Sequence, residues 1–239
     1  MIKLSIVIPC YNEEQRIGKS LETIHSFVRN INIEHEIIVV DDGSSDRTCE
    51  VVLNCCGGEN ETHRLLRNEK NRGKGYSVRR GVLEATGDYI LFSDADLSTP
   101  IEEALRLIAK LEDGFDVAIG SRALPNSKVE IRQNFFRELM GKIFNKIARL
   151  LTFKGIKDSQ CGFKCFKREA AKKIFSLQKL DGFSFDVEVI YLAQKIGFKV
   201  AEIPVIWRNS TASKVNVVAD PIKMFFDLIK IRVMHINDV

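Results

Sequence analysis

The chain has 239 residues, of which 45% are hydrophobic and 28% are charged. This ordinary globular composition excludes a low-complexity chain and suits one large domain or two small ones. Its apolar stretches fall short of the ~18–20 residues that a membrane-spanning helix needs, and its N-terminus lacks a signal-peptide pattern. The six cysteines show no paired C-x-x-C spacing, which favours reduced thiols in a cytosolic protein over disulfides or metal ligands.

The net charge of +4 hides an uneven distribution of charge along the chain. Residues 1–120 contain 14 Lys/Arg and 21 Asp/Glu, a net charge of −7, whereas residues 121–180 contain 15 and 4, a net charge of +11. Such a basic block indicates either a partner that is an anion, such as a phosphate or a lipid headgroup, or a solvated helical face. The block lacks a regular series of aromatic residues that would stack on bases, which argues against nucleic acid.

Strands and helices are predicted to alternate along the first half of the chain. Strands are expected within residues 3–12, 37–40, 63–75, 88–100 and 115–122, and helices within 13–30, 47–56, 76–86 and 101–112. The strands are continuous apolar runs, and the helices carry apolar residues on one face. This pattern predicts an α/β fold with an open, mainly parallel sheet that is covered by helices on both faces.

The second half of the chain is predicted to contain long amphipathic helices. One helix is expected over 132–151, a strand and a helix within 158–175, a helix over 182–197, a strand over 199–209 and a terminal helix over 220–233. Lys and Arg alternate with the apolar residues of the first and last of these helices. Both helices are therefore expected either to lie on a membrane surface or to pack against the sheet.

Polar residues follow the carboxyl end of each predicted strand in the first half. They are Pro9, Tyr11, Asn12 and Glu13; Asp41 and Asp42; Asp94 and Asp96; and Ser121 and Arg122. Ligands of open α/β sheets bind outside the carboxyl ends of the strands. We therefore expect these groups to converge on one crevice.

Asp94 and Asp96 are the strongest chemical signal in the sequence. Residues two apart in an extended chain point to the same side, so both carboxylates face one ligand. Two like charges this close need a cation between or beside them. A hard divalent ion, Mg²⁺ or Mn²⁺, held together with phosphate oxygens and water meets this need. The alternative for Asp96 is that it caps the helix that follows.

The glycine-rich run NRGKGYS gives a weaker signal. The chain has no G-x-G-x-x-G after its first strand, and this run lacks the spacing of a P-loop. It either presents backbone N–H groups and Lys74 to a phosphate or is a plain loop.

Eight motifs together carry a resemblance to a known family. They are, in chain order, IVIPCYNEE, VVDDGSSD, NRGKG, DADLSTP, GSR, QCGFK, FDVE and SKVNV. The set runs from about residue 3 to about residue 232 and resembles the inverting glycosyltransferases of family two, which have the GT-A fold. Within that family it is most similar to the dolichyl- or polyprenyl-phosphate sugar transferases, and to their dolichyl-phosphate β-glucosyltransferase-like group in particular.

The resemblance implies roles for residues at the matching positions. Nucleotide-sugar contacts would come from Pro9, Tyr11, Glu13, Asp42, Lys74, Asp94 and Ala95, and further phosphate contacts from Arg208 and Lys214. Asp94 and Asp96 would face a divalent metal, and Asp96, Arg122 and Arg137 would be catalytic, with the two arginines receiving the lipid phosphate or stabilising developing charge.

One position departs from the pattern of the mannosyl relatives. They usually carry a glutamine metal ligand two residues after the second aspartate, where this chain has Ser98. A serine side chain reaches less far, so this departure favours the glucosyl branch.

The implied activity is inverting transfer of a hexose, glucose from UDP-glucose in the first instance, onto a dolichyl or polyprenyl phosphate. A phosphate acceptor is already an anion and needs cations for positioning rather than a strong base. A sugar-hydroxyl acceptor would need a base, for which Asp186 or Glu188 is the candidate. Transfer from GDP-mannose and a non-catalytic scaffold role remain the alternatives.

One GT-A domain is expected over residues 1–239. Residues 1–120 would form its nucleotide-sugar half and residues 121–218 its acceptor half, with residues 219–239 as an amphipathic helix and tail. The protein is expected to be cytoplasmic and peripheral at a membrane face.

Overall fold

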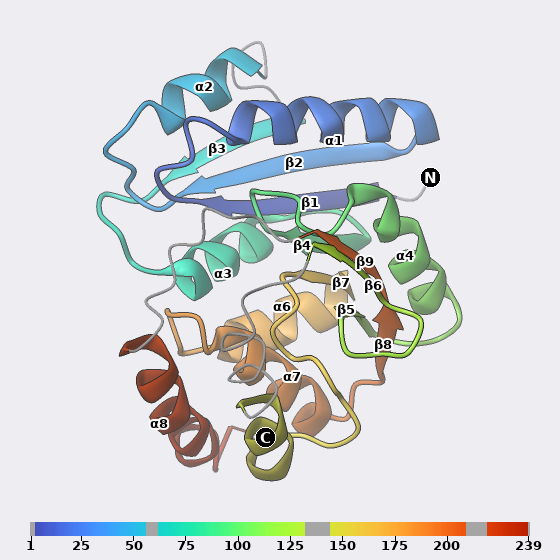
Figure 1. The fold of residues 1–239 in the computed structure, drawn as a ribbon, viewed down its shortest axis with the longest axis vertical. Coiled ribbons are helices and arrows are strands. Elements are labelled where there is room, and N and C mark those ends of the chain that lie inside the picture. Colours follow the sequence, from blue (N-terminus) through green and yellow to red (C-terminus); the bar gives the residue numbers. More distant parts are fainter. Residues whose placement is uncertain (1–2, 56–61, 132–143, 209–218, 239) are drawn as a thin grey trace.

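The computed structural model describes residues 3–55, 62–131, 144–208 and 219–238 (Figure 1). Its strands are β1 Lys3–Cys10, β2 Glu34–Asp41, β3 His63–Arg67, β4 Tyr89–Ser93, β5 Val117–Ser121, β6 Lys128–Ile131, β7 Phe163–Lys167, β8 Val200–Pro204 and β9 Ile206–Arg208. Its helices are α1 Ile17–Ile31, α2 Thr48–Cys55, α3 Lys74–Glu84, the short 3₁₀ helix η1 Ile101–Glu103, α4 Ala104–Glu112, α6 Arg168–Leu177, α7 Phe185–Ile196 and α8 Ala219–Met234, and residues 144–151 are also helical.

A seven-stranded sheet forms the centre of the fold, with the strand order β3-β2-β1-β4-β7-β5-β8. Strand β7 runs antiparallel to β4 and β5, and the other pairs are parallel. The predicted open, mainly parallel sheet is thus confirmed. The carboxyl ends of β1, β2, β4 and β5 and the amino end of β7 meet at one edge, and the predicted site residues that follow these strands lie there.

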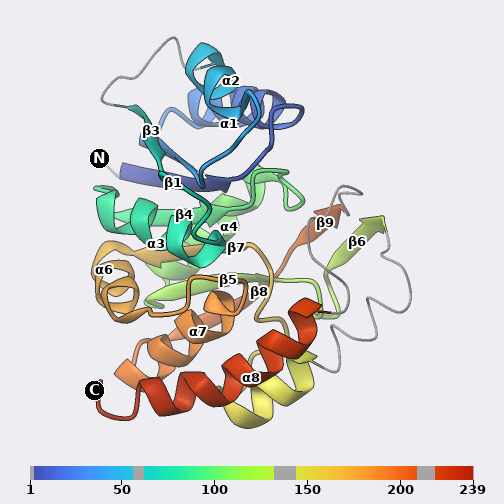
Figure 2. The ribbon, with the colours of Figure 1, turned by 90° about the vertical axis from the view of Figure 1, so that its left-hand side faces the viewer.

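Helices cover both faces of the sheet (Figures 1 and 2). Side chains of β1 alternate between the faces, because Ile6 and Ile8 pack in one apolar cluster and Val7 packs in the other. The Ile6 cluster contains residues of α1, α2 and α4, and the Val7 cluster contains residues of α3, α6, α7 and α8. Burial of both clusters holds the strand ends at fixed positions.

The strand expected over 199–209 is in fact two strands in different sheets. Strand β8 pairs with β5 as far as Ser121 and Pro204, where β5 ends. With no further partner there, the chain turns away at Val205, and β9 pairs with β6 in a two-stranded sheet beside the main one. The helix expected within 76–86 also differs from expectation, because it begins at Lys74 and ends at Glu84.

The other helices expected in the second half are confirmed as α6, α7 and α8. The helix expected over 132–151 is described only from residue 144, and its residues 144–151 are helical. In the described ranges, no helix is both long and apolar enough to cross a membrane. Among the described residues, Cys10, Cys49, Cys55, Cys161 and Cys165 are free thiols.

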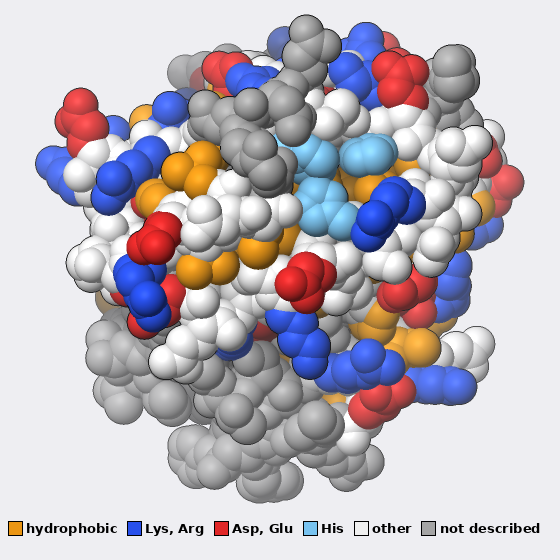
Figure 3. All heavy atoms as spheres, turned by 90° about the horizontal axis from the view of Figure 1, so that it is seen from above, with side chains coloured by type: hydrophobic (Ala, Val, Ile, Leu, Met, Phe, Trp, Pro, Cys, Tyr) orange, Lys and Arg blue, Asp and Glu red, His pale blue; other side chains and the backbone are white. Residues whose placement is uncertain are grey.

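Three histidines gather on a face remote from the strand ends that carry the site (Figure 3). His25 lies on α1, and His35 and His63 lie near the amino ends of β2 and β3. The ring centroids of His25 and His63 are 4.5 Å apart, and those of His35 and His63 are 6.2 Å apart.

Candidate active site

Asp42 fixes the glycine-rich loop by accepting hydrogen bonds from its main chain. Its carboxylate, only 4% exposed, accepts hydrogen bonds from the main-chain N–H of Arg72 at 2.9 Å and of Gly73 at 2.8 Å, and from the Asn68 side chain at 2.7 Å. Gly73 has φ +106°, and a Cβ on it would lie 2.4 Å from the carbonyl oxygen of Asp181. These contacts fix the conformation of the loop, so the loop is more than a plain connection. They also fix the start of α3 at Lys74.

Lys74 supplies the cation that the Asp94 carboxylate needs. Its Nζ lies 2.6 Å from Asp94 Oδ1, with 23% of the lysine side chain and 35% of the aspartate side chain exposed. The ammonium also lies 5.2 Å from the ring centroid of Phe92. Although burial acts to lower the pKa of Lys74, the carboxylates of Asp94, Asp186 and Asp96 raise it above its ordinary value.

The pKa of Asp94 is raised above its ordinary value. Burial is the largest cause, and the negative charges of Asp96 and Asp186 add to it, while Lys74 offsets only part of the increase. An added cation is therefore electrostatically favoured at this carboxylate.

Asp96 forms a turn rather than a helix cap. Its Oδ1 accepts a hydrogen bond from the main-chain N–H of Ser98 at 3.0 Å, and Leu97 between them has φ +46°. The helix that follows begins at Ile101, is capped at Pro100, and receives no hydrogen bond from a capping side chain. The helix-cap interpretation of Asp96 is therefore wrong, and its second carboxylate oxygen is left for another role.

A buried ion pair lies beside the Asp94 site. The ammonium of Lys164, 1% exposed, binds Asp186 and donates to the carbonyl oxygen of Cys161 at 2.7 Å. It lies 5.8 Å from the ring centroid of Phe92, so Lys164 and Lys74 both lie near this ring. Sequence reasoning assigned no role to Lys164, because a lysine in a strand carries no signal of its partner.

Arg122 is held by Asp158, which sequence reasoning also missed. The guanidinium makes two parallel hydrogen bonds to the carboxylate, at 2.7 and 2.8 Å, and the Arg122 main-chain N–H donates a third at 2.9 Å. Although burial acts to raise the pKa of Asp158, Arg122 holds it below its ordinary value. The guanidinium carbon also lies 5.4 Å from the ring centroid of Trp207.

Arg208, the last residue of β9, lies in the small sheet. The side chain of Arg208 pairs with Glu130 at 2.7 Å, and its main-chain N–H donates to the carbonyl oxygen of Ser98 at 2.7 Å. This second contact brings the end of β9 next to the segment that follows Asp96. Arg137 and Lys214 lie outside the described residues.

The predicted nucleoside contacts lie at the end of β1. Pro9 is buried in the strand, Tyr11 is 37% exposed, and Ala95 is buried near the end of β4. Glu13 pairs with Arg16, and its main-chain N–H donates to Thr48 Oγ1 at 2.7 Å. These residues and Asp42 follow adjacent parallel strands, so the expected convergence at one edge of the sheet is observed.

Neither candidate base is available to a sugar hydroxyl. Asp186 is buried against Lys164. Glu188 is fully buried and accepts hydrogen bonds from the main-chain N–H groups of Lys179 and Leu180, both at 2.8 Å, and contacts His235 Nε2 at 2.6 Å. The oxygens of Glu188 therefore join α7 to the segment before it and to the residues after α8.

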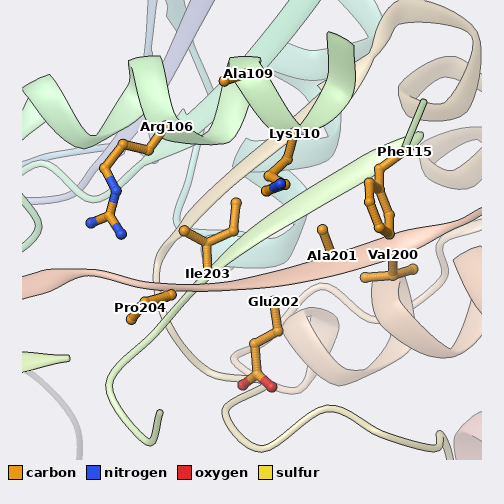
Figure 4. Close-up of a pocket in the computed structure, with 9 residues that line it drawn as sticks. All are labelled: Arg106, Ala109, Lys110, Phe115, Val200, Ala201, Glu202, Ile203 and Pro204. Carbon is orange, nitrogen blue, oxygen red and sulfur yellow. The ribbon is translucent and has the colours of Figure 1, made fainter. Parts of the chain in front are cut away.

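A groove of about 590 Å³ opens elsewhere, between α4 and the edge strand β8 (Figure 4). Arg106 and Lys110 of α4 face Val200–Pro204 across it. None of the described residues that line this groove is a predicted site residue.

The donor set at Asp94 and Asp96 fits a hard divalent cation. It offers carboxylate oxygens, with one oxygen of each aspartate engaged by Lys74 or Ser98. In the described ranges, no group of three His, Cys, Asp or Glu side chains is arranged to hold a metal by itself. A shell completed by diphosphate oxygens and water is the arrangement that Mg²⁺ commonly adopts.

The sheet, its covering helices and the carboxylate pair at the end of β4 define a GT-A glycosyltransferase. Residues 5–175 match the family described as glycosyl transferase family 2, which is more than half of the chain. The chain therefore belongs to glycosyl transferase family 2, as the motifs predicted.

Similar curated proteins share one name. The chain is 35% identical to the dolichyl-phosphate beta-glucosyltransferase of Dictyostelium discoideum over 98% of this chain and 75% of the relative. It is 37% identical to the protein of that name from Saccharomyces cerevisiae, over 98% and 75% of the two chains. It is 36% identical to the human protein of that name, over 98% of this chain and 76% of the relative.

Solved structures support the same fold at lower sequence identity. Mannosyl-3-phosphoglycerate synthase from Rubrobacter xylanophilus matches with a TM-score of 0.72 and 19% identity, over 99% of this chain and 74% of that one. Glucosyl-3-phosphoglycerate synthase from Mycobacterium tuberculosis, solved with Mn²⁺ and UDP-glucose, matches with a TM-score of 0.66 and 19% identity over 97% and 78%. These likenesses confirm the GT-A fold.

Proposed function

We propose that this chain transfers glucose from UDP-glucose to a dolichyl or polyprenyl phosphate, with inversion at the anomeric carbon and with the help of Mg²⁺ or Mn²⁺. The name shared by the curated relatives supports the donor sugar and the acceptor. The metal and the nucleotide draw support from the glucosyl-3-phosphoglycerate synthase that was solved with Mn²⁺ and UDP-glucose.

The observation that carries the proposal is that both candidate bases, Asp186 and Glu188, are paired with other groups. Asp186 and Glu188 are both held by other partners, so neither is placed to remove a proton from a hydroxyl acceptor. A phosphomonoester needs no such base, because it is largely ionised near neutral pH. It needs cations, and Lys74 and Arg122 are held at this edge of the sheet by buried or half-buried partners.

The reaction follows from this arrangement. An acceptor phosphate oxygen forms a bond to the anomeric carbon from the face opposite the diphosphate, and the bond from that carbon to the diphosphate breaks. Its electron pair leaves with UDP. A divalent ion held by Asp94 and Asp96 would neutralise part of the charge on the departing diphosphate. Lys74 at the start of α3 adds a second positive charge, and Arg122 orients the acceptor phosphate.

We also propose peripheral contact with the cytoplasmic face of a membrane, where such an acceptor resides. The exposed face of α8 carries Phe226, Ile229 and Val233, which are 64%, 50% and 64% exposed, and Lys230 and Arg232 lie among them. Apolar side chains with interleaved basic residues suit a lipid surface with anionic headgroups.

The test is a donor and acceptor screen with the purified chain. UDP-glucose with Mn²⁺ and a short-chain polyprenyl phosphate should yield UDP and a β-linked lipid glucosyl phosphate. Asp96→Asn should abolish turnover without unfolding the protein. Faster turnover with GDP-mannose would overturn the assigned donor, and turnover with an oligosaccharide in place of the lipid phosphate would overturn the assigned acceptor.

A further inference from the structure

The contact between Lys74 and Asp94 puts a protein cation on a carboxylate that the proposed function assigns to the metal. The Nζ–Oδ1 distance of 2.6 Å is that of a direct charged hydrogen bond. Two cations repel each other at a single oxygen atom, so a divalent ion that binds Oδ1 displaces the ammonium. Lys74 and the metal therefore compete for Asp94.

The surrounding charges show why a cation is held there at all. Asp94, Asp96 and Asp186 act together on Lys74, and Lys164 neutralises Asp186. Three carboxylates and two ammonium groups give a formal net charge of −1. Removal of Lys74 alone would make the formal net charge of the cluster −2. Replacement of Lys74 by a divalent ion would make it zero. A divalent ion in place of Lys74 therefore balances the charge of the cluster better than the ammonium does.

The position of Lys74 in the fold determines where its displaced ammonium goes. Lys74 is the first residue of α3, and Asp42 fixes the loop before it through the N–H groups of Arg72 and Gly73. The backbone at Lys74 therefore stays in place, and only the side chain can move. The Lys74 side chain lies at the N-terminus of α3, where an anion such as a diphosphate is favoured.

We propose that Lys74 couples metal binding to nucleotide binding by occupying Asp94 until both arrive. This inference rests on the proposed metal-dependent function and adds a residue that controls the order of binding. Without nucleotide, a metal must displace Lys74 and leave its ammonium without an anionic partner, so the metal binds weakly. With a nucleoside diphosphate present, the ammonium moves from Asp94 to the phosphates, so each ligand strengthens binding of the other.

The test measures Mn²⁺ binding to the purified chain by the loss of the free-ion electron paramagnetic resonance signal, with and without UDP. In the wild type, UDP should strengthen Mn²⁺ binding at least tenfold. Lys74→Met should bind Mn²⁺ alone roughly fivefold more tightly than the wild type, the scale of one partly exposed ion pair. The same variant should bind UDP more weakly and show a smaller effect of UDP on Mn²⁺.

Lys70→Met is the matched control, because Lys70 is an exposed lysine four residues away in the same loop. It removes the same charge without touching Asp94, so its Mn²⁺ affinity should equal that of the wild type. Equal affinities of Lys74→Met and Lys70→Met for Mn²⁺ alone would overturn the competition while leaving the metal-dependent function intact. If Mn²⁺ fails to bind the wild type even with UDP, the metal-dependent function and the coupling both fall.

Discussion

Gly162 and the carboxylate of Asp94 lie so close together that a larger residue fits at position 162 only if the Asp94 side chain moves. A Cβ there would lie 2.0 Å from Asp94 Oδ2 and 2.4 Å from its Cγ, and the main-chain N–H of Asp94 donates to the carbonyl oxygen of Gly162 at 3.1 Å. The glycine of the QCGFK motif thus holds the aspartate of the DAD motif in place from the neighbouring strand.

We expect Gly162→Ala to inactivate the enzyme while leaving it folded. The added methyl meets the far end of a side chain that can rotate away, so the cost to stability is small. Asp94 must move, however, and small errors in the position of a reacting group can reduce the rate by about 100-fold. Turnover of UDP-glucose and the thermal midpoint, measured on the same preparation, check both parts.

Gly182→Ala is the control for this substitution. A Cβ at Gly182 meets nothing within 4 Å, although the residue lies in a loop whose carbonyl oxygen approaches Gly75. It should retain activity within about twofold, because no neighbour has to move. A similar loss of activity in both variants would mean that the rigidity of the loops, and not the contact with Asp94, is what matters.

Asp158 provides a second prediction, this time on stability. Asp158→Asn removes the charge that holds Arg122 in a bidentate pair with a carboxylate that is 2% exposed. Breaking a buried pair typically costs about 3–5 kcal/mol. Because Arg122 keeps 27% of its side chain exposed, we expect a smaller loss of about 2 kcal/mol in the free energy of unfolding.

Urea denaturation near neutral pH measures this loss, with Glu130→Gln as the control. Glu130 pairs with Arg208 at the same distance of 2.7 Å, but both side chains are about half exposed. That pair should contribute less than about 1 kcal/mol. Equal effects of the two substitutions would contradict the view that burial makes the Arg122 pair important.

The mainly parallel sheet and its polar edge were predictable from the sequence, whereas the order of the strands and the pairing of charges were not. Continuous apolar runs that end in Pro9, Asp42, Asp94 and Arg122 suffice to predict a parallel sheet with one polar edge. Periodicity carries no information about which side chains meet across 20 or more residues, so the partners Lys74 and Asp158 were not paired with Asp94 and Arg122. Periodicity could not predict the division into β8 and β9 either, because this division depends on where the neighbouring strand β5 ends.

The exposed face of α8 leads to a prediction on membrane binding. Phe226→Ser should weaken binding of the chain to vesicles of anionic lipid by about tenfold, because a phenylalanine side chain contributes about 1.5–3 kcal/mol when it leaves water. Leu53→Ser on α2 is the control, since Leu53 is 40% exposed but lies on a helix that packs in the other apolar cluster. Vesicle flotation measures both variants, and equal binding of Phe226→Ser and the wild type would exclude α8 as the contact.

His25 and His63 make the stability of the protein depend on pH below neutrality. Burial, together with the neighbouring His25 and His35, lowers the pKa of His63 to about 4, and burial and Arg29 lower that of His25. An unfolded chain protonates its histidines near pH ~6.5. Between about 6.5 and 4 the unfolded state therefore binds more protons than the folded state, so the free energy of unfolding falls as the pH falls. Urea midpoints at pH 7.5 and 5.5 should show this decrease, and His63→Gln should reduce it. An equal decrease in the variant would rule out His63 as its source.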